Sequence, residues 1–277
     1  MLPDAEVIGT DVARALREDV GSGDLTASLL PSSRSGKAHL VCRDRAVLAG
    51  RAWFDEVFRQ VDGGLSVSWA FDDGDELSGG ARVCSIEGRA TSILTAERTA
   101  LNFLQTLSGV ATATAAYVRA VSGTGVRILD TRKTIPGLRQ AEKYAVTCGG
   151  GHNHRMGLYD AILIKENHIA AEGSIPAALE KARRLHPGVE IEIEVENIGE
   201  LEEALAAGAK RVLLDNFDLE ELSRAVALNR GRARLEASGG VDLDSVRAIA
   251  ETGVDDISVG AITKNLQSVD FSLRLEV

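Results

Sequence analysis

Six short apolar runs in the second part of the chain are each followed by charged or glycine-rich residues. In chain order these endings read DTRK at 130–133, KEN at 165–167, EVE at 194–196, DN at 215–216, SGG at 238–240 and VGA at 259–261. In α/β folds, binding and catalytic groups gather where parallel strands end. The six endings therefore predict one functional cleft at the carboxyl edge of a parallel sheet.

Basic residues are concentrated between positions 127 and 165, where seven lysines and arginines stand beside three acidic residues. The whole chain of 277 residues carries 31 basic and 41 acidic residues, which gives a net charge of −10. A positive pocket in an acidic protein suits a small, multiply charged anion and repels nucleic acids. The expected pocket residues, at or just after strand ends, are Arg132, Lys133, Arg155 and Lys165. Arg139 and Lys143, four residues apart, fit a solvated helix face instead.

The run EIEIEVE at 190–196 is unusual, because a strand buried on both faces is normally apolar throughout. Glu192, Glu194 and Glu196 share one face, so the strand either lies at a wet edge or borders a polar lumen. Buried carboxylates need compensating cations. Lys165 and Asp215 at neighbouring strand ends favour the polar lumen, in which Glu194 and Asp215 would hold Mg²⁺, directly or through water, or substrate hydroxyls.

The last two strand endings are rich in glycine. Glycine lets backbone N–H groups approach an anion closely, and the N-terminus of a following helix adds to the attraction. Barrel enzymes commonly bind phosphate in these last two loops, so a phosphate site is expected, with ordinary turns as the alternative. Its residues would be Ser238, Gly239, Gly240, Val259, Gly260 and Ala261.

A histidine pair, His152 and His154, follows the three glycines at 149–151. A metal site is one interpretation, with His168 as the further histidine that could contribute. Arg155 and Lys133 would repel a divalent cation, so an anion-binding loop made flexible by glycine is the favoured interpretation. No nucleophile-elbow motif indicates covalent catalysis.

The rest of the chain predicts two scaffolds for these residues. The first is an α+β domain, residues 1–107, with strands at 37–42, 65–71 and 82–86 and helices at 10–19, 51–61 and 92–107. A second helix, 110–121, is expected after a break at Ser108-Gly109. Strand centres then recur every 20 to 34 residues, the spacing of βα units, over a barrel domain at 108–267. The alternating tail, 268–277, predicts a strand that rejoins the N-terminal domain.

The composition excludes several classes of protein. Hydrophobic residues make up 44% and charged residues 26%, as in globular proteins. An aromatic content of 4% argues against a base-stacking platform, and no apolar stretch approaches the roughly 18 residues of a membrane span. The N-terminus has no signal-peptide pattern, and Cys42, Cys84 and Cys148 form no C-x-x-C motif. A cytoplasmic protein without nucleic-acid or membrane partners is expected.

Several motifs together resemble one known family. LDTRKTIPGLRQAEKYAV, GGGHNHRMGLYDAILIKENHI, IEIEVEN, VLLDNF, LEASGG and ISVGAIT occur in this order, after LREDVGSGDLTASLLP and AERTALNFLQTLSGVATATAAYV. The chain is similar to quinolinate phosphoribosyltransferases, the carboxylating nicotinate-nucleotide pyrophosphorylases of NAD biosynthesis. The resemblance implies an N-terminal α+β sandwich-like domain, an incomplete α/β (TIM-like) barrel and a homodimer or larger homo-oligomer. One departure is Asp256, where an apolar or aromatic residue is more usual, and it is expected to disturb packing before the last barrel strand.

The resemblance also implies a reaction and residues for it. Quinolinate and phosphoribosyl pyrophosphate (PRPP) would give nicotinate mononucleotide, pyrophosphate and CO₂, without a redox or organic cofactor. The implied substrate-binding residues are Arg98, Thr131, Arg132, Lys133, His154, Arg155 and Lys165, with Lys133 on the phosphoribosyl side. The catalytic residues would be Lys133, Lys165, Glu194 and Asp215, with Mg²⁺ on the two acids and the 5-phosphate in the two glycine loops.

Arg98 lies on the predicted helix 92–107, about 115° from the centre of its apolar stripe, and so points away from its own core. The resemblance implies that it enters the quinolinate site of the neighbouring subunit. Two other functions remain open at this point. One is a phosphoribosyltransferase for another aromatic acid, and the other is a non-catalytic sensor of small anions.

Overall fold

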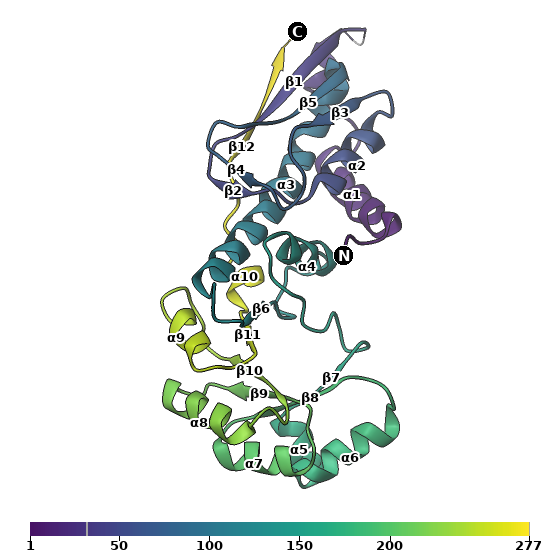
Figure 1. Ribbon diagram of the computed structural model, residues 1–277. Helices are drawn as coiled ribbons and strands as arrows, with labels where there is room; N and C mark the ends of the chain where they lie inside the picture. The colour runs from purple at the N-terminus through teal and green to yellow at the C-terminus, as the bar shows by residue number, and fades with distance from the viewer. Residues whose placement is uncertain (32, 277) are drawn as a thin grey trace. The chain divides into compact units, whose positions relative to one another are not determined.

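The computed structural model describes residues 1–31 and 33–276, which divide into two compact units (Figure 1). Unit 1 comprises Met1–Ala115, Ile135–Gly150 and Asn265–Val277, and unit 2 comprises Ala116–Thr134 and Gly151–Lys264. One helix, α3 (Ala90–Ala120), belongs partly to each unit. The combination of an antiparallel sheet in one unit and a parallel sheet in the other confirms the expected fold class.

Unit 1 is built on a four-stranded antiparallel sheet in the order β12-β1-β5-β3. Its strands are β1 (Ser35–Cys42), β3 (Ser66–Trp69), β5 (Arg82–Arg89) and β12 (Phe271–Glu276), with a separate short pair, β2 (Ala46–Val47) and β4 (Glu76–Leu77). Phe271 pairs with Cys42 and Leu275 with Ala38, so the predicted return of the tail to the N-terminal layer is confirmed. Residue 277 of the predicted strand lies outside the described residues.

The helices of unit 1 bury apolar faces against this sheet or one another. They are α1 (Ala5–Asp19), α2 (Arg51–Val61), α4 (Arg139–Cys148), the first part of α3 and a short turn of 3-10 helix (Ala27–Leu29). On α2, the spacing of Trp53, Phe54, Val57 and Phe58 places all four on one side, where they are buried. These large side chains supply much of the core of the unit.

The predicted helix break at Ser108-Gly109 is wrong, because residues 90–120 form one continuous helix. A Cβ on Gly109 would come within 2.3 Å of the carbonyl oxygen of Gln267, so glycine is present there for a close approach. The Ser108 hydroxyl accepts a hydrogen bond from Ala49 N at 3.1 Å and donates one to Ala49 O at 3.2 Å. Both residues therefore serve packing between segments and do not end the helix.

Unit 2 contains a six-stranded sheet in the order β6-β11-β10-β9-β8-β7, and every neighbouring pair is parallel. Its strands are β6 (Arg127–Leu129), β7 (Ile162–Ile164), β8 (Ile191–Val195), β9 (Arg211–Asp215), β10 (Arg234–Ser238) and β11 (Asp256–Ser258). These are the six strands that the sequence predicts. β6 and β7 are the two ends of the sheet, so the barrel is incomplete, as expected.

Short helices connect the strands of unit 2, several with clear start signals. They are α5 (Glu166–Glu172), α6 (Ile175–Leu185), α7 (Ile198–Ala206), α8 (Leu219–Asn229), α9 (Val246–Glu251) and α10 (Ala261–Lys264). The side chains of Ser174, Asn197 and Asp218 accept backbone N–H bonds at the starts of α6, α7 and α8. α6 packs against β7 and β8, and α7 against β8.

The two faces of the parallel sheet differ in polarity. One face is apolar and buried, with Ile128, Ile164, Ile193, Val195, Val212, Leu214, Leu235, Ala237 and Ile257. The other face carries Glu192, Glu194, Arg211, Arg234, Glu236 and Asp256, and the strand register places these residues on the same side. The predicted polar lumen is therefore confirmed.

Candidate active site

The carboxyl ends of the strands bring the predicted site segments together in a fixed order. Because β11 lies next to β6, the 130–133 segment lies beside Val259, Gly260 and Ala261. Next along the edge come Ser238, Gly239 and Gly240, then Asp215, Glu194 and Lys165. The glycine loops thus occupy one side of the edge and the carboxylates the other.

The loop that carries His154 and Arg155 is anchored to the end of β6. His152 forms a parallel bridge with Leu129. The fully buried Asp130 accepts hydrogen bonds from His154 N at 2.9 Å and from Asn153 Nδ2 at 2.6 Å. Asp130 therefore fixes the HNHR segment beside the DTRK segment, a role that its place at a strand end did not reveal.

Arg132 and Arg155 are close enough for their charges to interact. Burial lowers the pKa of the Arg155 guanidinium, and the nearby positive charge of Arg132 lowers it further. Arg155 also donates from Nη1 to the carbonyl oxygen of Ala161 at 3.3 Å, which fixes its side chain. The charges of Asp160, Glu192 and Glu194 partly offset this repulsion, and each guanidinium group can bind a carboxylate through two hydrogen bonds.

Lys165 and Glu194 form an ion pair between neighbouring strand ends. The Lys165 side chain is 41% exposed and that of Glu194 only 10%, so the ammonium group reaches the cleft while the carboxylate lies deeper. The Lys165 backbone N donates to Nδ1 of His168 at 3.0 Å, at the start of α5. His168 thus completes a helix start, and the structure does not bring it together with His152 and His154.

Glu194 and Asp215 end adjacent strands, β8 and β9, and offer the oxygen ligands that Mg²⁺ prefers. Asp215 accepts a hydrogen bond from Asn216 Nδ2 at 2.8 Å, and Glu194 is paired with Lys165. The donor types therefore fit a hard cation, although at Glu194 the ion would share its carboxylate with an ammonium group.

The glycine loops are shaped by close contacts. Gly239 and Gly240 have φ of +110° and +59°, and a Cβ on Gly239 would lie 2.2 Å from Asn216 Oδ1. On Gly260 a Cβ would lie 3.1 Å from Lys133 Cδ and 3.7 Å from Thr131 Oγ1, so this glycine makes room for both side chains. A helix follows each loop, but α9 begins only at Val246, whereas α10 begins directly after Gly260.

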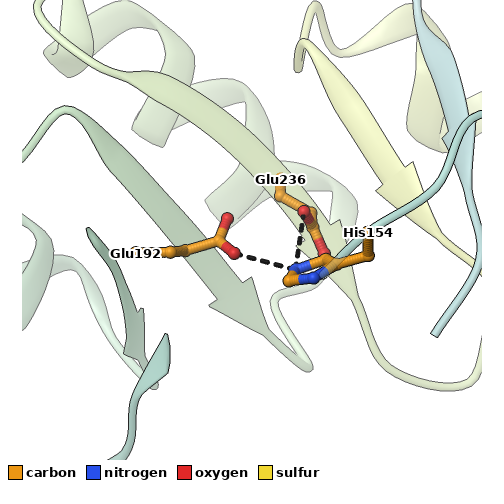
Figure 2. A group of neighbouring side chains, drawn as sticks. All are labelled: His154, Glu192 and Glu236. Atoms are coloured by element: carbon orange, nitrogen blue, oxygen red, sulfur yellow. Dashed lines mark hydrogen bonds and ion pairs between the residues drawn. The ribbon is translucent and has the colours of Figure 1, made fainter. Parts of the chain in front are cut away.

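His154 lies in the lumen between two glutamates, one on β8 and one on β10, as Figure 2 shows. Its Nε2 is 2.8 Å from Glu192 Oε2 and 3.5 Å from Glu236 Oε2. Its Nδ1 accepts a hydrogen bond from Arg155 N at 2.7 Å. The ring atoms expected to face a substrate therefore have protein partners. Glu236 escaped the sequence analysis, although a glutamate inside an otherwise apolar strand was a signal for it.

Two expectations about charged residues are wrong. Lys143 is fully buried and does not lie on a solvated face, whereas Arg139 is partly exposed. Asp256 is the first residue of β11 and does not disturb packing. It accepts hydrogen bonds from Arg127 Nε at 2.8 Å and from Arg234 Nε at 2.5 Å, which compensate its burial.

Arg98 lies on α3 in unit 1 and is exposed, as the helix geometry predicts. Cys42, Cys84 and Cys148 are free thiols, the first two buried. Among the described residues, every helix is too short or too polar to cross a membrane.

This fold defines a protein of the α/β-barrel class, with basic residues and two glycine loops at the carboxyl edge of its parallel sheet. The sequence profile of the quinolinate phosphoribosyl transferase N-terminal domain matches residues 24–108, and that of the C-terminal domain matches residues 110–274. The chain therefore belongs to the quinolinate phosphoribosyltransferase family.

Relatives in bacteria and plants share most of the chain. The nicotinate-nucleotide pyrophosphorylase [carboxylating] of Mycobacterium leprae is 42% identical, over 95% of each chain. The quinolinate phosphoribosyltransferase [decarboxylating] 1b of Nicotiana tabacum is 39% identical over 95% of this chain and 80% of its own length. The solved structure of the Francisella tularensis nicotinate-nucleotide pyrophosphorylase superposes with a TM-score of 0.97 at 46% identity, covering 99% of this chain and 98% of that one.

Proposed function

We propose that the protein transfers the phosphoribosyl group of PRPP to quinolinate and releases pyrophosphate and CO₂, giving nicotinate mononucleotide for NAD biosynthesis. The observation that carries this proposal is the set of basic residues at the carboxyl edge: Arg132 follows β6, Lys165 follows β7, and the charge of Arg132 lowers the pKa of Arg155. Quinolinate has two adjacent carboxylates and therefore needs at least two fixed cations. Membership of the family supports the same reaction.

The basic side chains and the glycine loops would divide the work. Arg132, Arg155 and Lys165 would bind the carboxylates of quinolinate, with Arg geometry suited to bidentate contacts. Lys133 and the loops at 238–240 and 259–261 would bind the phosphates of PRPP, because backbone N–H groups can approach an anion where side chains are absent. The pyridine nitrogen then faces ribose C1 from the cationic side, so that positioning supplies much of the rate acceleration.

The chemistry requires charge stabilisation at three stages. The C1–O bond to pyrophosphate breaks, and the carboxylates of Glu194 and Asp215 stabilise positive charge on the ribose. The pyridine nitrogen bonds to C1 and becomes cationic. The C2–carboxylate bond then breaks, CO₂ leaves with the electron pair remaining on C2, and a proton takes its place. Electrons are neither gained nor lost overall, so the reaction needs no redox cofactor.

Glu194 and Asp215 would hold Mg²⁺, which when bound neutralises charge on the pyrophosphate leaving group. The support is their place at adjacent strand ends and their oxygen donors. Replacing Glu194 by Gln and Asp215 by Asn should raise the Mg²⁺ and PRPP concentrations needed for half-maximal rate. The quinolinate concentration needed should rise less. Equal increases for all three would contradict this assignment.

The proposed reaction is tested by incubating the protein with PRPP, Mg²⁺ and either quinolinate or nicotinate. Mononucleotide and CO₂ should form with quinolinate and not with nicotinate. Product from nicotinate alone would show a different aromatic acid as substrate, and binding of quinolinate without turnover would show a sensor. Either result would overturn the proposal.

The homodimer remains part of the proposal, with Arg98 completing the quinolinate site of the partner subunit. Its support is that Arg98 is exposed on α3 and that the motif around it resembles the family. An Arg98→Ala chain mixed with a Lys165→Ala chain should regain activity once subunits exchange, because some heterodimers then hold one site with both residues. Verified heterodimers without activity would contradict a shared site.

We also expect the protein in the cytoplasm, where free thiols persist.

A further inference from the structure

His154, Glu192 and Glu236 form a buried cluster to which the proposed reaction assigns no proton. Glu192 is 3% exposed and Glu236 is 1% exposed. In each of them, Oε1 has no hydrogen-bond partner. An unpaired charged oxygen in the interior costs far more free energy than an unpaired neutral one. Keeping one of the two carboxyl groups in its acid form would therefore stabilise the cluster.

The two carboxyl groups compete for the same donors. The Nε2–H of His154 bonds to Glu192 at 2.8 Å and lies 3.5 Å from Glu236, so Glu192 has the better contact. Nη2 of Arg211 on β9 lies 3.5 Å from Glu192 Oε1 and 3.4 Å from Glu236 Oε2. The hydroxyl of Ser258 on β11 is a further, weaker partner of Glu236. One ring N–H and one guanidinium nitrogen do not satisfy two carboxylates.

The other charged groups of the lumen have partners of their own. These pairs are Arg127–Asp256, Arg234–Asp256, Lys165–Glu194 and Arg211–Glu190. Arg211 is also within 3.7 Å of Asp256, so its single charge is divided further. The strands on either side of Glu236 therefore give it only a share of the charge of Arg211.

The hydrogen bonds of His154 decide where the proton is held. Nδ1 accepts the backbone N–H of Arg155 at 2.7 Å, so Nδ1 carries a lone pair and the ring is the neutral Nε2–H tautomer. Burial lowers the pKa of His154, but the hydrogen bond to Glu192 and the charges of Glu236 and Glu192 together raise it, and a protonated Glu236 removes its share of that effect. With the ring neutral and Glu192 accepting its N–H, the remaining proton belongs to Glu236.

We propose that Glu236 is a protonated positioning residue, which keeps His154 neutral and thereby holds the backbone of Arg155 in place for the substrate. Ionised Glu236 would draw a second proton onto His154, and a proton on Nδ1 would break the bond from Arg155 N. Burial, and then the charge of Glu192, raise the pKa of Glu236 to about 8. The proton should therefore be present at pH 7 and lost above pH 8. The effect on substrate rests on the proposed function, whereas the location of the proton does not.

Kinetics over pH 6–9.5 test the positioning role with Glu236→Gln, Glu192→Gln and the control Glu190→Gln, whose wild-type side chain is 62% exposed. Above pH 8 the quinolinate KM of the wild type should rise about tenfold per pH unit. Gln resembles the neutral acid, so Glu236→Gln should keep the KM within about twofold at pH 7 and should lack this alkaline rise. Glu192→Gln should raise KM about tenfold at every pH, and kcat should change less. An unchanged alkaline rise in Glu236→Gln would overturn the proposal, as would a loss at pH 7 equal to that of Glu192→Gln.

Infrared difference spectra between pH 7 and pH 9.5 locate the proton without any substrate. All variants should carry Glu142→Gln, because burial also raises the pKa of Glu142 to about 7. A protonated-carboxyl band should be present at pH 7, disappear at pH 9.5, be missing in Glu236→Gln and persist in Glu190→Gln. This band with no turnover of quinolinate would refute the proposed function and leave the proton assignment standing. Absence of the band would refute the proton assignment. So would stoichiometric zinc or manganese that is lost in Glu236→Gln, since one ligand atom each of His154, Glu192 and Glu236 lie within 4.8 Å of one another and could hold a metal ion.

Discussion

The polar lumen has a floor, formed by Arg127, Arg234 and Asp256 at the starts of β6, β10 and β11. This floor and the carboxyl edge of the same sheet hold their charges in opposite ways. At the floor, Asp256 accepts hydrogen bonds of 2.5–3.2 Å from Arg127 and Arg234. At the edge, the like charge of Arg132 lowers the pKa of Arg155, and nearby carboxylates offset this only in part. Charges that satisfy one another inside the chain stabilise the fold, whereas like charges near each other are stabilised further by a bound anion. The comparison separates structural from functional charges within one sheet.

The largest expected effect is on stability, from removal of the floor acid. Asp256→Ala should lower the free energy of unfolding by about 3–5 kcal/mol, because it removes the buried acceptor of several charge-assisted hydrogen bonds from Arg127 and Arg234, whose side chains are 38% and 35% exposed. Chemical denaturation measures this, with the exposed Asp244→Ala as the control. A loss below about 1 kcal/mol would show that the floor network is not structural.

The same carboxyl should make the wild type sensitive to acid. Burial alone would raise the pKa of Asp256, but the bonds from Arg234 and Arg127 hold it below its ordinary value of 3.8. A carboxyl whose pKa is lower in the folded state stabilises that state at pH values above its pKa in the unfolded chain. This stabilisation is lost as the pH falls through its pKa in the folded state. The stability gap between wild type and Asp256→Ala should therefore narrow below about pH 4.

Lys165→Ala tests the edge and should act on turnover. Loss of one fixed cation at the reacting centre should lower kcat/KM for quinolinate by about 10²–10³ with little change in melting temperature. Lys181→Ala is the matched control, because Lys181 forms a comparable ion pair with Glu172 and is 44% exposed. A large drop in melting temperature with normal activity per folded molecule would make Lys165 structural.

Arg155→Lys tests whether the edge needs the shape of a guanidinium as well as its charge. A lysine cannot make two parallel hydrogen bonds to a carboxylate, so the quinolinate KM should rise about tenfold while the PRPP KM stays within about twofold. Steady-state kinetics with each substrate varied in turn decide this. Equal changes for both substrates would assign Arg155 to a general electrostatic role.

Much of the fold followed from the sequence because strand alternation and βα spacing are local patterns. The six parallel strands, the polar lumen and the return of the tail were all predicted. The break at Ser108-Gly109 was not, because a glycine that ends a helix and one that admits a neighbouring carbonyl look alike in sequence. Burial of Lys143 and pairing of Asp256 likewise depend on partners far away along the chain.

The site divides in the same way. The strand-end rule placed Arg132, Lys133, Lys165 and the glycine loops along one edge, whereas Arg155 lies on the long connection between β6 and β7. It did not identify Asp130 as the anchor of the HNHR loop, nor Glu236 as a partner of His154, because both roles depend on side chains meeting across the lumen. Residues at strand ends can thus be predicted from position, whereas the side chains that hold them in place need the structure.

The smallest expected effect comes from Gly260→Ala. Its Cβ would lie 3.1 Å from Lys133 Cδ, the flexible stem of a lysine that can shift by a few tenths of an ångström. The PRPP KM should rise about two- to threefold, and quinolinate binding should not change. A loss above about tenfold would show that the glycine contacts phosphate directly.

The most direct test of the separation between floor and edge is calorimetric binding of quinolinate to Arg155→Ala and Asp256→Ala, each compared with its own melting temperature. Arg155→Ala should lose at least about tenfold in quinolinate affinity and keep the wild-type melting temperature. Asp256→Ala should melt at a lower temperature, yet its folded fraction should bind quinolinate as the wild type does. The opposite pattern, an unstable Arg155→Ala with normal affinity and a stable Asp256→Ala that fails to bind, would contradict the account.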